Sequence, residues 1–459
     1  MAADRRTGFS GVVLGGLLFI WFACCAAAEA SAIPEAIVAL NPNTEDTRYV
    51  IVVEKSLQRL KVFASGNGGV EPVNQWKCST GEVLGAKLQS GDKKTPEGVY
   101  FLVDKYEDRE LSPIYGVMAY PLDYPNFLDK NAGKNGSAIW LHGTNKELKD
   151  NDTNGCIALE NKNLKALSKY ISLNRTPVVI VEKMQLWSSD EAEQAGKRVR
   201  AFLDGWNKAL AEGDYHRYLD FYDTDYFPDM SWWNTWRDLC RSLHEGVPTF
   251  ALVPEAVSAF LHDGVYVVLF DQVISAGNSK ALVGKKKLFI ADAAGDLSII
   301  GETYHPFTDN QPAGGVDNPL VASSRRFKNS IMAEQEIKDL LDKWVRAWEA
   351  MNMDAYGECY SRGFVFKGMN RQKWLAYKRN LNRQYDYIRV ELTDLRFVEQ
   401  SRRRSVVTFI QHYTSDQYSD TGLKTLVLRQ EDGQWVIYRE SWKKLERLPE
   451  ESTLEQAGR

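Results

Sequence analysis

Cysteine is scarce in this sequence of 459 residues, which contains six in all. A disulfide-stapled scaffold is thereby excluded, because such folds need a dense set of paired cysteines. An excess of positive charge is also missing, since 57 Lys and Arg residues face 61 Asp and Glu residues. Nucleic acid is therefore not expected as a partner, because phosphate binding normally shows as a basic excess. The remaining composition is that of a globular chain with two to four domains.

Long apolar runs are missing except for one near the N-terminus, at residues 11–28. Arg5 and Arg6 precede this run, and Ala28-Glu29-Ala30 follows it. This pattern predicts a secretory signal peptide over residues 1–30, with cleavage after Ala30. The run is also near the lower length limit for crossing a bilayer, so an uncleaved N-terminal membrane tether is the alternative. Lipidation at Cys24 or Cys25 is a third reading. The rest of the chain is expected to be exported.

Residues 48–182 read as short strands separated by turn-rich segments. Only Asn163–Tyr170 looks helical in this part. The expected strands are Tyr49–Glu54, Gln58–Phe63, Gly98–Asp104, Ile114–Tyr120, Ser137–His142 and Pro177–Glu182. This pattern favours a compact β-sandwich or barrel.

The second half of the sequence contains an internal repeat with a shift of 138 residues. Trp206, Tyr218 and Glu302 coincide with Trp344, Tyr356 and Glu440, among many others. Each copy opens with an amphipathic helix and closes with alternating strands. This order resembles the nuclear-transport-factor-like (ketosteroid-isomerase-like) cone. The expected ranges are 198–308 for the first copy, 309–329 for a Gly-, Pro-, Asn- and Ser-rich linker, and 334–445 for the second copy.

His142 and Cys156 are the residues of the first domain that together could carry chemistry. His142 ends a predicted strand, and a loop of polar residues leads to Cys156. The spacing between His142 and Cys156 is long enough for one loop to return the chain to an adjacent strand. A thiol beside an imidazole can perform acyl transfer, because the imidazole accepts the thiol proton. Gly155 allows an unusual backbone angle before the nucleophile, and the amides of Gly155 and Cys156 could bind an oxyanion.

Other readings of these two residues stay open at this point. A lone cysteine at a strand end is often a small buried hydrophobe, and a lone histidine is often structural. A disulfide between Cys78 and Cys156 is the main structural alternative. Zinc is not expected, because no second histidine is available in this domain.

The motifs around His142 and Cys156 resemble those of the L,D-transpeptidase (YkuD-type) family. The chain has His142-Gly143-Thr144, a loop, and then Thr153-Asn154-Gly155-Cys156-Ile157. Lys94-Thr95-Pro96-Glu97-Gly98-Val99-Tyr100 is similar to a second hallmark of the family. The resemblance covers residues 48–182. The expected fold class is therefore multidomain, with a β-rich L,D-transpeptidase sandwich and two tandem α+β cones.

The resemblance implies a reaction on the peptide stems of bacterial peptidoglycan in the periplasm. Cys156 would form a thioester with the stem, His142 would act as base and acid, and the Gly143 carbonyl would orient the imidazole. Thr153, Asn154 and Gly155 would contribute to the oxyanion and substrate site. An amine from a second stem would resolve the thioester into a 3→3 cross-link. No metal or organic cofactor is implied.

Two departures from the family pattern leave the reaction open. The commonest motif has His at the position of Asn154 and Arg at the position of Ala158. The missing arginine removes a cation that could anchor a substrate carboxylate. Water would make the enzyme an L,D-carboxypeptidase of the cell-shape type, which trims tetrapeptide stems to tripeptides. A third hypothesis is a non-catalytic protein that binds the cell wall.

The repeated half is not expected to catalyse. Its many tryptophans could stack on the sugars of glycan strands, although most are expected to fill the cores of the cones. The pair Trp232-Trp233 has no counterpart in the second copy and is the best candidate for an exposed contact. The charge runs Lys285–Lys287 and Arg402–Arg404 are expected to be solvated.

Overall fold

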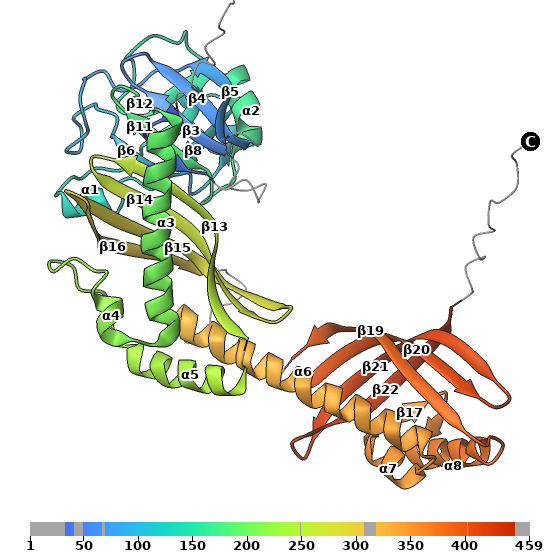
Figure 1. The fold of residues 1–459 in the computed structure, drawn as a ribbon. Helices are drawn as coiled ribbons and strands as arrows, with labels where there is room; N and C mark the ends of the chain where they lie inside the picture. Colours follow the sequence, from blue (N-terminus) through green and yellow to red (C-terminus); the bar gives the residue numbers. More distant parts are fainter. Residues whose placement is uncertain are drawn as a thin grey trace, which may run out of the picture.

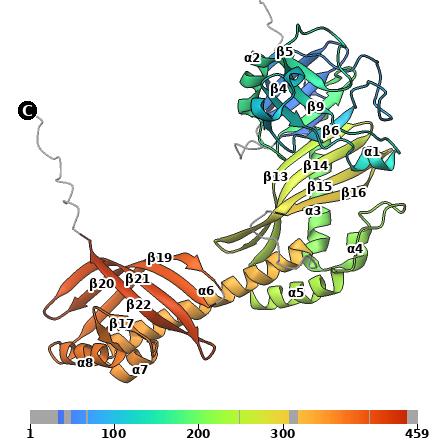
Figure 2. The ribbon, with the colours of Figure 1, turned by 180° about the vertical axis from the view of Figure 1, so that it is seen from behind.

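The computed structural model describes residues 33–40, 49–66, 69–247, 249–306, 318–401 and 403–445. The predicted signal peptide over residues 1–30 lies outside these residues. The described chain forms a β-domain, a first cone and a second cone (Figures 1 and 2). Both views place the first cone between the β-domain and the second cone. The predicted fold class, a β-rich sandwich followed by two α+β cones, is confirmed.

The β-domain consists of two sheets packed over one core. The first sheet has the order β5-β4-β3-β11-β6 and the second has the order β10-β9-β8-β7. The strands are β3 (Tyr49–Glu54), β4 (Arg59–Gly66), β5 (Gly69–Lys77), β6 (Gly98–Phe101), β7 (Tyr106–Glu107), β8 (Met118–Pro121), β9 (Trp140–Thr144), β10 (Ile157–Glu160) and β11 (Pro177–Val181). The predicted helix is present as α2 (Asn161–Leu167), continued by the 3₁₀ turn η4 (Ser168–Tyr170). Alternating apolar residues of both sheets, with Cys78, fill the space between them.

The two cones repeat one architecture, as the 138-residue shift predicted. The first cone contains α3 (Ser189–Glu212), α4 (Tyr215–Leu219), α5 (Trp233–Gly246), β13 (Phe250–His262), β14 (Val265–Ala276), β15 (Ser279–Ala293) and β16 (Asp296–Pro306). The second contains α6 (Pro319–Glu349), α7 (Met353–Glu358), α8 (Arg371–Asn382), β19 (Ile388–Gln400), β20 (Arg404–Ser415), β21 (Ser419–Glu431) and β22 (Gln434–Lys444). Even the irregularities correspond, because the first strand of each cone has a bulge at the same place, after Glu255 and after Thr393.

Each cone encloses the same buried polar network. In the first cone the Tyr222 hydroxyl accepts from the Trp206 indole and donates to Glu302, which pairs with Lys286 at 2.9 Å. In the second cone the corresponding residues are Trp344, Tyr360, Glu440 and Lys424, with the ion pair again at 2.9 Å. The recurrence of Glu302 and Glu440 therefore reflects a shared structural network that satisfies buried polar groups.

The helix boundaries of the cones follow their capping residues. Helix α3 begins before the predicted boundary at residue 198, because Ser188 and Glu191 form a capping box. Helix α6 begins at Pro319, inside the predicted linker over residues 309–329, because Asn318 caps it and proline fits its first turn. The N-terminal half of α6 packs in the first cone and its C-terminal half packs in the second.

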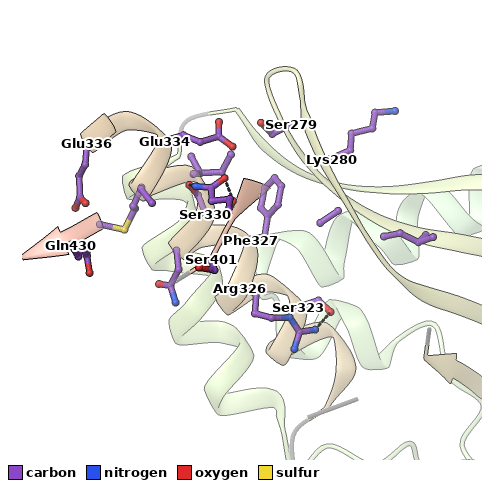
Figure 3. Close-up of a pocket in the computed structure, with 17 residues that line it drawn as sticks. Ser279, Lys280, Ser323, Arg326, Phe327, Ser330, Glu334, Glu336, Ser401 and Gln430 are labelled. Atoms are coloured by element: carbon purple, nitrogen blue, oxygen red, sulfur yellow. Dashed lines mark hydrogen bonds between the residues drawn. The ribbon is translucent and has the colours of Figure 1, made fainter. Parts of the chain in front are cut away.

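The two cones also meet beside α6 at a pocket of about 860 Å³ (Figure 3). Ser330 of α6 exchanges hydrogen bonds of 3.0 and 2.9 Å with Gln400, the last residue of β19. Arg326 donates to the Ser323 hydroxyl at 3.0 Å along the same helix. The hydrogen bonds between Ser330 and Gln400 thus hold helix α6, which connects the cones, to the sheet of the second cone.

Two expectations about surface residues are wrong. Lys285, Lys286 and Lys287 are buried, and each has a carboxylate partner: Asp271, Glu302 and Asp123. They lie on β15, which is paired on both sides, so they cannot form a solvated edge. Trp233 is 2% exposed and packs against the Tyr218 ring in the first cone, while Trp232 is half-buried.

The first cone packs against the outer face of the five-stranded sheet of the β-domain. Phe127, on α1 (Phe127–Asn131), stacks on Phe289 of β15 with ring centroids 5.2 Å apart. It also fills the space beside Gly301, where a Cβ would strike its ring. The Lys287–Asp123 ion pair, at 3.1 Å, links the same two parts. The β-domain and the first cone therefore share an apolar core.

Candidate active site

The sheet topology brings the predicted nucleophile and base onto neighbouring strands. Strands β9 and β10 pair in parallel, with His142 opposite Ala158. Cys156 stands directly before β10, and its thiol donates to the Ala138 carbonyl at 3.5 Å, just before β9 begins. The loop between His142 and Cys156 thus returns the chain to the adjacent strand, as the spacing predicted.

The His142 imidazole is held in one tautomer. Its Nδ1 lies 2.6 Å from the Gly143 carbonyl oxygen, and only a protonated Nδ1 can donate to that acceptor. The Nε2 atom is therefore left as the acceptor. The ring is 7% exposed and meets the Tyr115 ring edge-on, with centroids 5.1 Å apart. Burial lowers the pKa of His142, partly offset by the Gly143 hydrogen bond.

Cys156 is a free thiol, and so is Cys78, so the alternative of a Cys78–Cys156 disulfide does not hold in this structure. Burial raises the pKa of the Cys156 thiol, while a backbone hydrogen bond at Trp140 and the charge of Lys87 act in the opposite direction. A raised thiol pKa and a lowered imidazole pKa favour a neutral pair at rest. The arrangement therefore suits general-base transfer of the thiol proton at the moment of attack.

The reactivity of Cys156 should depend on pH through His142. Because the pKa of His142 is lowered, its neutral base form persists to a more acidic pH than that of a free imidazole. The rate of Cys156 alkylation should therefore fall only below pH 6.5, the ordinary value. Iodoacetamide labelling followed by mass spectrometry of the Cys156 peptide measures this midpoint. A midpoint above that of free imidazole, or an unchanged profile in His142→Gln, would contradict the assignment.

The turn before Cys156 is tied down by two threonines. Thr153 Oγ1 accepts from the Gly155 N–H at 3.1 Å and donates to the Cys156 carbonyl at 2.7 Å. Thr95 Oγ1 donates to the Gly155 carbonyl at 3.0 Å and accepts from the Gly81 N–H at 2.9 Å. Thr95 belongs to the Thr-Pro motif of the sequence, which carried the only advance signal of this role. The Asn154 side chain is exposed beside this turn.

Gly155 must be glycine for two reasons. Its φ is +120°, which L side chains rarely adopt, and a Cβ would lie 2.6 Å from the Lys94 carbonyl oxygen. We expect Gly155→Ala to destabilise the fold by about 1–3 kcal/mol and to slow Cys156 alkylation. Gly246→Ala is the matched control, because a Cβ there meets nothing within 4 Å. Thermal unfolding compares the two, and equal melting temperatures would show that the turn relaxes freely.

The described residues show two further absences. None of their His, Cys, Asp and Glu side chains gather in groups of three or more that could hold a metal ion. Within the same ranges, no helix has the length and apolar character needed to cross a bilayer.

Comparisons with known proteins define the class of the β-domain. Residues 48–180 match the L,D-transpeptidase catalytic domain, YkuD, and residues 336–441 match the Cds6 C-terminal NTF2-like domain. The chain therefore carries a catalytic domain of the L,D-transpeptidase family, whose members act on peptidoglycan, and an NTF2-like domain in the second cone.

Two solved structures are similar over more than one domain. Bd1075 from Bdellovibrio bacteriovorus is 20% identical, and the match covers 91% of this chain and 100% of that chain with a TM-score of 0.34. The helical cell shape determining protein Pgp2 from Campylobacter jejuni is 26% identical, covering 56% and 91% with a TM-score of 0.43. No curated protein sequence matches this chain.

Proposed function

We propose that this protein is a periplasmic peptidoglycan L,D-transpeptidase that works through a thioester on Cys156. The observation that carries the proposal is a free thiol placed next to the strand of a tautomer-locked histidine, in a domain of this family. The substrate polymer lies outside the cytoplasm, so export by residues 1–30 belongs to the same proposal.

The proposed reaction needs only groups of this chain. His142 Nε2 accepts the thiol proton as the sulfur attacks the carbonyl of the third stem residue. The oxyanion is bound by the backbone N–H of Cys156, with the exposed Asn154 amide beside it, because the Gly155 N–H already donates to Thr153 Oγ1. The C–N bond to the terminal D-Ala breaks, and His142 returns the proton to the leaving amine. An amine of a second stem then attacks the thioester, forms the new amide bond and releases the thiol.

Hydrolysis of the same thioester is the second candidate, and one position favours it. Ala158 stands where the commonest family motif has arginine, and it is buried in a backbone bridge with Ser79. No cation is available at this position to hold the carboxylate of an incoming stem. Water as the acceptor would give an L,D-carboxypeptidase.

One experiment decides between these functions. The purified chain is incubated with disaccharide-tetrapeptide, and the products are identified by mass spectrometry. Cross-linked dimer is the expected result and supports transpeptidation. Tripeptide with free D-Ala assigns the carboxypeptidase, and unchanged substrate assigns a non-catalytic wall-binding protein.

The second cone supports a proposal about the wall polymer as partner. Its pocket, of about 390 Å³, is lined by aromatic rings, among them Trp348, Trp374 and Trp442. Lys378 lies 3.9 Å over the Trp348 ring and, in the described part of the chain, forms no ion pair. Buried Trp374 Nε1 and Gln411 Oε1 also have no hydrogen-bond partner among the described residues. We propose that sugars and carboxylates of the wall satisfy these groups.

Binding to isolated sacculi should depend on Lys378 and on pH. Burial lowers the pKa of Lys378 to about 7, and only its ammonium form attracts an anion. We expect Lys378→Met to weaken binding about tenfold, and wild-type binding to weaken as pH rises through 7. Lys373→Met, on the exposed side of α8, is the control. Equal pelleting of both variants with sacculi would remove the pocket from the proposal.

A further inference from the structure

Asn161 is a polar residue whose side chain links two segments that lie beside His142. It is the first residue of α2, yet its side chain does not cap that helix, which begins after Glu160 without a side-chain cap. Its Oδ1 instead accepts from the Val117 N–H at 3.1 Å, and its Nδ2 donates to Asn145 Oδ1 at 2.7 Å. Its bonds thus go to two segments that flank the imidazole.

These bonds extend to the turn that packs on the imidazole. Asn145 Nδ2 donates to the Pro113 carbonyl at 2.9 Å, at the start of the 3₁₀ turn η3 (Pro113–Tyr115). The last residue of that turn, Tyr115, packs edge-on against His142 and tilts against Trp140 at 4.8 Å. Asn161 and Asn145 therefore hold both ends of the segment that presents the Tyr115 ring.

Two glycines make room for the Asn161 amide. A Cβ at Gly116 or at Gly143 would strike Asn161 Oδ1, so the amide oxygen sits in a slot between the two backbones. Gly116 also has a φ of +66°. Gly143 is the residue whose carbonyl fixes the His142 tautomer. Gly143 thus has a second role. Because it lacks a Cβ, the Asn161 side chain can pack directly against the Gly143 backbone.

We propose that Asn161 is a positioning residue, which holds His142 in its reacting orientation through Gly143 on one side and Tyr115 on the other. The inference rests on the proposed Cys156–His142 pair. It does not depend on the substrate, because Asn161 acts on the imidazole and not on a ligand. The proposal gives α2 a role in orienting His142, which the His-Gly and Gly-Cys motifs of the sequence do not indicate.

The test compares Asn161→Ala with Asn163→Ala in the full chain. Asn163 lies on the same helix, and its side chain donates to Glu160 at 3.4 Å, outside the site. Two quantities are measured: the pH profile of Cys156 alkylation by iodoacetamide, and the ¹⁵N chemical shifts of the His142 ring, which report its tautomer. For Asn161→Ala we expect alkylation at pH 7 to slow about tenfold and the ring to lose its single Nδ1–H tautomer. Asn163→Ala should match the wild type.

A second variant keeps the test decisive if Asn161→Ala does not fold. Asn145 is exposed, and Asn145→Ala removes its bonds to the Pro113 carbonyl and to Asn161 Nδ2, while the bond from the Val117 N–H to Asn161 Oδ1 remains. It should slow alkylation by a smaller factor while leaving the melting temperature near that of the wild type. Wild-type profiles and ring shifts in the variants that fold would overturn the proposal. Neither measurement uses a wall substrate, so failure here and failure of the proposed function are separate results.

Discussion

Replacing Cys156 with alanine is expected to abolish turnover of a tetrapeptide stem, by at least about 10³-fold. Cys156 is the half-buried thiol beside the His142 strand, whereas the other described cysteines are buried elsewhere. Without the sulfur no thioester forms, and neither cross-linking nor hydrolysis can follow by this route. Mass spectrometry of the products after a fixed incubation measures the loss.

Cys78 supplies the matched control for that loss. It is fully buried in the core between the sheets, and burial raises its pKa to about 12, so it is not a nucleophile. Cys78→Ala should keep the turnover of the wild type, with at most a small loss of stability from the smaller side chain. Turnover that survives in Cys156→Ala, or that disappears only in Cys78→Ala, would show that the acyl group is carried elsewhere.

His142→Ala should reproduce most of the loss with the thiol still present. A raised thiol pKa leaves little thiolate near neutral pH unless a base removes the proton. Alkylation of Cys156 in this variant should therefore rise only at alkaline pH. The two variants together separate the nucleophile from its base.

Much of the β-domain could be predicted from local sequence. The strand over Tyr49–Glu54 has the predicted bounds, because its β-branched run and flanking turn are local signals. The neighbouring strands of His142 and Cys156 could also be predicted, since a single loop joins them. The repeat predicted the cones for a similar reason, as two copies of one pattern reinforce each other.

The features that sequence reasoning missed depend on distant partners. Strand β2 (Ile37–Ala39) pairs with β13 of the first cone, and nothing in its few residues specifies that partner. Lys285–Lys287 look solvated as a charge run, but their partners lie on other strands and, for Lys287, in the β-domain. The Asn161 network likewise joins segments that only the folded sheet brings together.

The largest effect on stability is expected from removing the first cone. The outer face of the five-stranded sheet presents Val50, Val52, Val99, Phe101 and Val179, which are buried against Phe260, Val267, Leu269 and Phe289 of the cone. Exposing such a set costs on the order of 10 kcal/mol, which is comparable to the whole stability of a domain. A chain ending at residue 183 should therefore aggregate or fail to unfold cooperatively.

Removing only the second cone should have a much smaller effect. Leu320, Val321 and Phe327 of α6 pack in the core of the first cone, so the cut belongs after Ala333 and not at the predicted linker. A chain ending at residue 333 should unfold cooperatively and keep wild-type alkylation of Cys156, while losing binding to sacculi.

Size-exclusion chromatography, thermal unfolding and labelling compare the two truncations. A monomeric, cooperatively unfolding chain that ends at residue 183 would show that the β-domain does not need the cone. The first cone therefore completes the apolar core of the β-domain and cannot be removed, whereas the second cone can.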